Sequence, residues 1–311
     1  MPDPGDDVLG RVLETTQLRG QVYCSTLARA PWGLGVATSP VAMFHVITDG
    51  ACWLLGGDPP RQLASGDIVL FPRGAAHALA DHPRSRRLAL EDWLATPAQG
   101  GERRLGSATG APARVICGIF TFDTPAPRHP VLRLLPDTLY LRGERNRERP
   151  DLAATIAALT REHARVSSGM SLVISRLLDV LFVQIVRAWA DDQPSGGAGW
   201  IGALHDSTLA RALALLHGDL GRAWDVESLA RAAGTSRATL GRRFVAEVGE
   251  PPLAYLARLR MQEAARRLQR SDASVAAIAH DVGYASEFAF NRAFRREHGA
   301  PPGAYRKQAQ A

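Results

Sequence analysis

The chain has 311 residues, of which 46% are hydrophobic and 22% charged, a composition that supplies two folded cores and excludes a largely disordered protein. Its formal net charge is +6, and most of the excess lies in residues 201–311, which carry 16 basic and 11 acidic side chains. A modest local excess of this kind suits contacts with phosphate groups, although a solvated arginine-rich surface gives the same count.

The sequence predicts a cytoplasmic protein with no membrane partner. Residues 1–7 are acidic and lack the apolar core of a secretory signal. The longest apolar stretch, from Met170 to Trp189, is typical of an amphipathic helix because charged and amide side chains interrupt it. Three cysteines are too few for a disulfide framework in a chain of this size, which favours a reducing compartment.

Residues 20–122 show short β-rich runs separated by glycine-rich turns, the pattern of a sandwich or barrel. The expected strands are Gln21–Leu27, Phe44–Thr48, Ala51–Leu55, Asp67–Phe71, His77–Ala80 and Val115–Phe122. We place a turn at Asp49-Gly50, between the second and third of these strands.

The apolar period becomes helical after Pro136. We expect helices near residues 152–166 and 171–190, then a flexible linker at the Pro-Ser-Gly-Gly-Ala-Gly stretch that begins at Pro194. Everything after the linker is predicted to be helical.

Two stretches that lie 50 residues apart repeat one pattern. Phe244 is followed by Gly249, Pro251, Pro252 and Tyr255, and Phe294 is followed by Gly299, Pro301, Pro302 and Tyr305. An apolar helix pattern that ends in Gly234 or Gly283 precedes each copy. Each unit is therefore predicted to be helix, glycine turn and second helix, a layout that docks its second helix into DNA.

Side chains at the helix starts support these boundaries. We expect Asp225, with Ser228 as a weaker choice, and then Ser236, Ser274 and Ser286 to cap the four helices. A helix from Pro252 to about Gln269 would join the two units, and its length of roughly 26 Å suits a spacer between two recognition helices about one DNA turn apart. The same helix can equally be an ordinary core helix.

The outer faces of the second helices supply the residues that we expect to contact DNA. They are Ser236, Arg237, Thr239, Arg242 and Arg243 in the first unit, and Ser286, Glu287, Asn291, Arg292 and Arg295 in the second. Arginine pairs with guanine and asparagine with adenine, whereas serine and threonine more often hold phosphate.

This region resembles the AraC/XylS family of bacterial transcription regulators. The resemblance covers about residues 207–307 and rests on Ser228-Leu229-Ala230, Ile278-Ala279, Gly283-Tyr284-Ala285-Ser286, Phe290, Arg292-Ala293-Phe294-Arg295, Gly299, Pro301 and Tyr305-Arg306. It implies a double helix-turn-helix reader of double-stranded DNA. The pair Glu287-Phe288 replaces small polar residues often found in the family, so base preference cannot be transferred from relatives.

The N-terminal region resembles the second half of a cupin motif, carried by residues 63–77, in which a strand ends at a Pro-x-Gly turn and delivers His77 into a β-barrel. The resemblance implies a sensor domain. It does not imply the usual cupin metal centre, because His45 lacks a second histidine two residues away and no glutamate follows it closely.

Four residues on or beside the predicted strands form a second candidate site: Cys24, His45, His77 and Cys117. If all four point inward, they would suit zinc, and oxidation of the thiols would release the metal. Each can instead be a buried core residue. Cys52, beside Trp53, is expected to be structural. An organic effector in an apolar barrel, with His77 and Arg73 near its mouth, is a further alternative.

The sequence thus predicts an α+β protein with a cupin-like sensor at 1–135, a helical dimerisation segment at 136–193, a linker at 194–206 and a double helix-turn-helix domain at 207–311. We expect a DNA-binding transcriptional regulator, not an enzyme, that responds to an effector, a metal or thiol oxidation. Its expected partners are DNA, a second copy of the chain and, if it is an activator, RNA polymerase. The pairing hypothesis rests on Leu172, Ile174, Leu178, Leu181 and Ile185. Two alternatives are a cupin metalloenzyme with an appended DNA-binding domain and a metal or thiol store that binds DNA nonspecifically.

Overall fold

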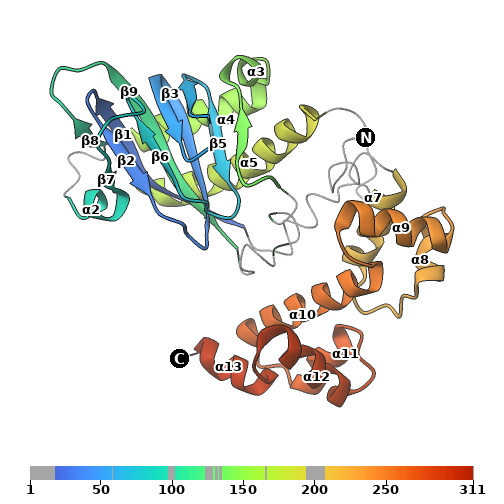
Figure 1. Ribbon diagram of the computed structural model, residues 1–311. Helices are drawn as coiled ribbons and strands as arrows, with labels where there is room; N and C mark the ends of the chain where they lie inside the picture. Colours follow the sequence, from blue (N-terminus) through green and yellow to red (C-terminus); the bar gives the residue numbers. More distant parts are fainter. Residues whose placement is uncertain are drawn as a thin grey trace. The chain divides into compact units, whose positions relative to one another are not determined.

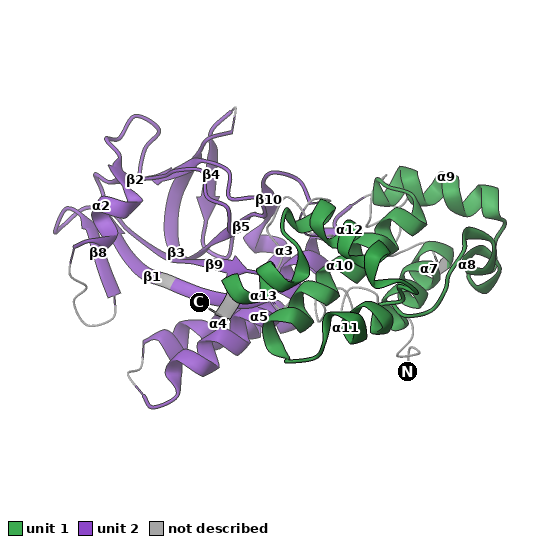
Figure 2. Cartoon of the chain, turned by 90° about the horizontal axis from the view of Figure 1, so that it is seen from below, with its two compact units in different colours: residues 1–16, 194–311 green, residues 17–193 purple. Residues whose placement is uncertain are grey.

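The computed structural model describes residues 18–57, 59–96, 102–122, 129, 132, 135–164, 167–193 and 207–310. Within these ranges the chain forms two compact units, shown in purple and green in Figure 2: a sheet with helices that ends at residue 193, and an all-helical unit that begins with α7. The expected α+β fold class is confirmed. The predicted linker at 194–206 lies outside the described residues.

One curled sheet, a half-barrel, forms the first unit (Figure 1). Its strands are β1 (Arg19–Arg29), β2 (Gly33–Val36), β3 (Ala42–Leu55), β4 (Arg61–Ala64), β5 (Ile68–Phe71), β6 (His77–Ala80), β7 (Leu88–Ala89), β8 (Glu102–Gly106), β9 (Pro112–Thr121) and β10 (Leu139–Leu141). The main strand order is β7-β2-β6-β3-β9-β1-β8, and β4, β5 and β10 extend it. The long strand β9 lies between β1 and β3 and is antiparallel to both.

The turn predicted at Asp49-Gly50 is wrong. β3 runs without interruption from Ala42 to Leu55, and its register against β9 shifts between Ile47 and Asp49. Gly50 has a φ of +72°, and a Cβ atom there would lie 2.3 Å from the carbonyl oxygen of Pro112. The register shift leaves Thr48 as the extra residue of a bulge, and Gly50 lies in the strand that continues beyond it, opposite Ala113. The positive φ and the close Pro112 carbonyl explain the glycine without a turn.

Helices complete the first unit: α2 (Leu90–Leu94), α3 (Gly143–Arg147), α4 (Pro150–His163) and α5 (Met170–Asp191). The predicted helices near 152–166 and 171–190 are thus confirmed within a few residues. α5 packs along β1 and α4 packs along α5. Among the described residues, no helix combines the length and the apolar character that crossing a membrane requires.

The second unit consists of α7 (Ser207–Gly218), α8 (Val226–Ala232), α9 (Arg237–Val248), α10 (Pro252–Arg270), α11 (Val275–Asp281), α12 (Glu287–His298) and α13 (Pro302–Gln310). The duplication is visible in its packing. Phe244 meets Tyr255 edge to face at 5.6 Å, and Phe294 meets Tyr305 in the same way at 5.4 Å. α10 joins the two halves and contributes nine buried residues, so it is both a connector and a core helix.

The predicted caps are all present. Asp225 accepts the backbone N–H of Ser228 in a capping box, and Ser236, Ser274 and Ser286 each accept the N–H three residues later. Gly234 and Gly283 adopt φ angles of +78° and +84° in the turns between the helices, a conformation that favours glycine.

Replacing Ser274 by alanine is expected to lower the free energy of unfolding by about 1 kcal/mol, because the first turn of α11 loses the acceptor for the Ala277 N–H. Urea denaturation of the full chain, followed by helical circular dichroism, measures this change. Ser274→Asp restores an acceptor and should unfold like the wild type. Equal stability of the alanine variant and the wild type would contradict the capping role.

Candidate functional site

The second helix of each helix-turn-helix unit presents a polar outer face. On α9, Arg237, Arg242 and Arg243 are exposed and Thr239 is half-exposed, while Leu240 and Phe244 are buried behind them. The Ser236 hydroxyl donates to Thr239 Oγ1 at 2.9 Å and accepts the Thr239 N–H. Ser236 and Thr239 are therefore held in place at the helix start, where backbone N–H groups favour a phosphate.

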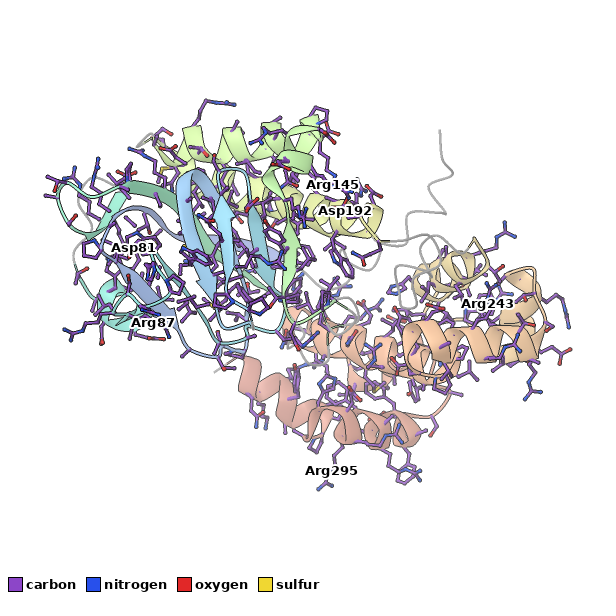
Figure 3. All side chains as sticks on the ribbon, turned by 45° about the horizontal axis from the view of Figure 1, so that its top comes forward. Asp81, Arg87, Arg145, Asp192, Arg243 and Arg295 are labelled. Carbon is purple, nitrogen blue, oxygen red and sulfur yellow. The ribbon has the colours of Figure 1, made fainter. Side chains whose placement is uncertain are left out.

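On α12, Glu287, Arg292 and Arg295 are exposed and Asn291 is half-exposed. Ser286 caps the helix, and the fully buried Phe290 and Phe294 form its inner face. Arg295 lies beside Phe294 in sequence, yet its side chain extends away from the helices (Figure 3). The structure therefore places the predicted DNA-binding residues at the starts and on the outer faces of α9 and α12, while contact with DNA stays a prediction.

Sequence reasoning overlooked Phe288 as a surface residue. Its side chain is 76% exposed on α12, whereas the other two phenylalanines of that helix are fully buried. The signal was available in the sequence, because the spacing of Phe290 and Phe294 fills the inner face and leaves Phe288 outside it.

Arg260 is a structural arginine and not a candidate for DNA. Its guanidinium donates to the carbonyl oxygens of Leu220 and Arg222 at 2.8 Å and of Gly283 at 3.2 Å. It thereby ties the segment before α8 to the turn that precedes α12, so the two halves of the helical unit are linked by more than α10.

The four predicted sensor residues come together in the sheet. Cys117 on β9 is the cross-strand partner of Cys24 on β1 and of His45 on β3. His45 Nδ1 lies 3.0 Å from Cys117 Sγ, and His45 Nε2 lies 2.7 Å from His77 Nε2. All four side chains are at least 94% buried, and the His77 ring stacks on Phe71 at 3.7 Å. The four side chains form a continuous buried row from Cys24 through Cys117 and His45 to His77, which we call the Cys–His row.

The hydrogen bonds between the two histidines of the Cys–His row have a defined direction. Burial lowers the pKa of His77 to about 4 and that of His45 well below its usual range, so both rings are neutral near pH 7. His77 Nδ1–H donates to the Ala75 carbonyl oxygen at 2.7 Å, which leaves His77 Nε2 as an acceptor for His45 Nε2–H. His45 Nδ1 is then an acceptor that faces the Cys117 thiol.

The two thiols differ in acidity. The hydrogen bond from Cys117 lowers the pKa of Cys24, against the opposing effect of burial, and Thr26 and Arg103 lower it further. The same hydrogen bond, together with burial, raises the pKa of Cys117 well above its usual value. Burial raises the pKa of Cys52 to about 12, as expected for the structural cysteine. Cys24 is therefore the thiol that ionises first.

The four side chains of the Cys–His row do not have the geometry of a metal site in this structure. Among the described residues, no group of three or more His, Cys, Asp or Glu side chains is arranged to hold a metal ion. The two Nε2 atoms are 2.7 Å apart and bonded to each other, whereas two ligands of one tetrahedral zinc ion lie roughly 3.3 Å apart. The rings would have to turn before both could bind one ion, so zinc stays a prediction.

A cavity of ≈ 700 Å³ lies beside the His77 end of the Cys–His row. Its lining includes Phe71, His77, Asp137 and Tyr140. Arg73 is not among the lining residues, but its guanidinium is bound to Asp137, which is, at 2.5 Å and to the carbonyl oxygens of Leu132 and Leu135 at 2.8 Å. Of the two residues expected near the mouth, His77 lines the cavity, and a role of Arg73 in binding an effector stays a prediction.

The face of α5 proposed for pairing is occupied by the chain itself. Ile174, Leu178, Leu181 and Ile185 are buried in the first unit. This part of the prediction is wrong, because the helix uses its widest apolar face to cover the sheet. The exposed apolar residues of α5 are Leu172, Val173 and Val180, with 62%, 44% and 47% of each exposed.

The chain is similar to known proteins along its whole length. Family models described as "Cupin" and "Helix-turn-helix domain" match residues 7–191 and 229–308. Putative AraC-like transcription regulators from Streptomyces lividans and Streptomyces antibioticus are 34% and 36% identical, with 98% of each chain covered. A solved DNA-binding domain of AdpA in complex with a target DNA covers 34% of this chain and 94% of its own, at 38% identity and a TM-score of 0.32. The chain therefore belongs to the AraC-like family of transcription regulators.

Proposed function

We propose that this regulator reads a specific DNA sequence through α9 and α12, and that the redox state of the Cys24–Cys117 pair controls it. One observation carries the second part of the proposal: two buried thiols of different acidity are direct cross-strand partners, and a histidine that can accept a proton lies 3.0 Å from the second thiol.

The backbone geometry favours a disulfide. Directly opposite residues in an antiparallel pair have Cα atoms roughly 4.5–5.5 Å apart, within the range of about 4.4–6.8 Å that a disulfide spans. Cys24 and Cys117 are such residues, on strands that pair along their whole length. The register shift between Val22 and Cys24 places irregular backbone beside the pair, which gives room for adjustment.

The proposed reaction uses a hydroperoxide as the oxidant. The Cys24 thiol first gives up its proton, and the thiolate attacks the outer oxygen of the hydroperoxide. The O–O bond breaks, Cys24 becomes a sulfenic acid, and the departing alkoxide or hydroxide takes up the proton that Cys24 released, so that an alcohol or water leaves. Cys117 then attacks the Cys24 sulfur and the S–O bond breaks. His45 Nδ1 accepts the Cys117 proton, which returns to the departing hydroxide to form water. Two electrons pass from the thiols to the oxidant, and one disulfide forms.

A structural connection from the thiols to α5 supports a regulatory output. Gly20 lies on β1 with Cys24, and its N–H donates to Asp179 Oδ1 of α5 at 3.2 Å. A Cβ atom on Gly20 would lie 2.2 Å from Leu178 Cβ, so strand and helix are in direct contact. A change in β1 at Cys24 therefore acts on α5, the last described element before the helical unit.

Three other inputs or activities remain distinguishable from this proposal. Zinc held by the same four residues would be lost on oxidation, and an organic effector would use the cavity beside His77. The names of the full-length relatives favour a regulator over a cupin metalloenzyme. We further propose that the protein acts in the cytoplasm and that it contacts RNA polymerase if it is an activator.

Arg242 and Arg292 occupy equivalent positions in the two copies and are the proposed main readers of bases. Arg292→Ala should weaken binding to the preferred duplex by about 1–3 kcal/mol and relax the sequence preference, because a bidentate guanine contact is lost. Fluorescence anisotropy with duplexes selected from a random library measures both effects. Arg231→Ala, which removes an ion pair with Glu227 on α8, is the matched control and should leave preference unchanged. A full-affinity Arg292 variant would remove this residue from the reading face.

Treatment of the reduced full chain with hydrogen peroxide should join Cys24 to Cys117 and leave Cys52 as a thiol, because only the first pair shares a hydrogen bond and a register position. Peptide mapping by mass spectrometry identifies the bond, and metal analysis before and after treatment reports any zinc released. Cys52→Ser should form the same disulfide. If Cys24 and Cys117 both stay reduced after treatment, and an organic ligand binds in the cavity, thiol control is contradicted.

We also propose that two chains pair through the exposed apolar residues of α5, which are Leu172, Val173 and Val180. The full chain should sediment as a dimer at micromolar concentration, and Val173→Glu/Val180→Glu should be a monomer because two buried charges would oppose association. Circular dichroism checks that the variant is folded. Wild-type protein that sediments as a monomer would contradict the pairing.

A further inference from the structure

Phe288 is the largest apolar side chain among the exposed ones that the structure describes. It is 76% exposed on α12, more than Leu172, Val245 or any other residue of this group. Leaving a phenylalanine side chain in water forgoes the stabilisation that burial of a large apolar side chain gives. Such a residue is expected to be covered when the protein acts.

The fold itself does not require a phenylalanine at this position. α9 and α12 are related by a shift of 50 residues, so that the cap Ser236 corresponds to Ser286 and Phe244 to Phe294. By the same shift, Ala238 on α9 corresponds to Phe288 on α12, and it is also exposed. The first helix-turn-helix thus starts its second helix with an equivalent serine cap and buries the equivalent Phe244 with only a methyl group at this place.

The neighbours of Phe288 indicate what covers it. Arg292 and Arg295 follow it by four and seven residues, so all three lie along one stripe of the helix, with Asn291 at its margin. The buried Phe290 and Phe294 occupy the opposite side. An apolar ring at the head of a stripe that continues with two guanidinium groups matches a surface that is both anionic and locally apolar, which favours DNA over an apolar protein face.

Resting on the proposed function, we infer that Phe288 is a specificity-determining residue that places its ring against the 5-methyl group of a thymine in the major groove. Phenylalanine is one of the side chains that contact this methyl group, and it lies in the first turn of the helix, where recognition helices approach the base edges. Arg292, one turn further along the same stripe, would then reach a neighbouring base or its phosphate.

The test compares duplexes that differ by one methyl group. The full chain and Phe288→Ala each select duplexes from a random library, and every thymine of the wild-type sequence is then replaced singly by deoxyuridine. For the wild type, at one or two thymines, the replacement should weaken binding roughly fourfold, the effect of one lost methyl contact. Phe288→Ala should bind the thymine and deoxyuridine duplexes equally at those positions. Its fold should be intact, because Ala238 occupies the equivalent place, and thermal unfolding checks this.

Two results would overturn the inference while leaving the proposed function standing. In the first, the wild type selects a sequence but no thymine is sensitive to loss of its methyl group, or Phe288→Ala keeps the sensitivity. In the second, Phe288→Ala keeps its affinity and preference but lowers transcription with purified RNA polymerase, which would assign the ring to a protein partner. A wild-type chain that selects no sequence at all would contradict the proposed function itself.

Discussion

The register of β9 between β1 and β3 is the constraint on which the sensor unit depends. It sets Cys117 opposite Cys24 on one side and opposite His45 on the other. The Cys117 side chain therefore belongs both to the thiol pair and to the contact with His45. Slipping β9 by one residue would turn Cys117 to the other face of the sheet and dissolve both contacts. The bulge at Thr48 belongs to the same constraint, because it takes up one extra residue of β3 and leaves the pairing of His45 with Cys117 intact.

The helical unit depends on a different kind of constraint, which is local and repeated. Serine caps fix where α9 and α12 begin, and the aromatic pairs Phe244–Tyr255 and Phe294–Tyr305 fix which sides face inward. The outer faces are consequently free to differ between the copies. Ala238 and Phe288 show this freedom, since the same scaffold carries a methyl group at one position and an aromatic ring at the other.

How much the sequence predicted follows from the range of each interaction. The caps were predictable, because a serine and the N–H that it satisfies lie three residues apart. The order of the four side chains in the Cys–His row was not predictable, because it depends on pairing between strands that are distant in sequence. The contact of Arg73 with Asp137 and the burial of the apolar face of α5 within its own unit were missed for the same reason. An apolar or charged pattern shows that a residue has a partner but does not show which one.

In the proposed mechanism, a thiol pair in one unit controls DNA reading by the other. The direct measurement is the affinity of the full chain for its selected duplex, compared between the reduced protein and the protein with the Cys24–Cys117 disulfide. We expect the two affinities to differ at least about fivefold, and to be equal in Cys117→Ser, because the disulfide alters β1 and its contact with α5. Equal affinities of the two forms would contradict the proposed mechanism and leave the thiol chemistry without a regulatory role.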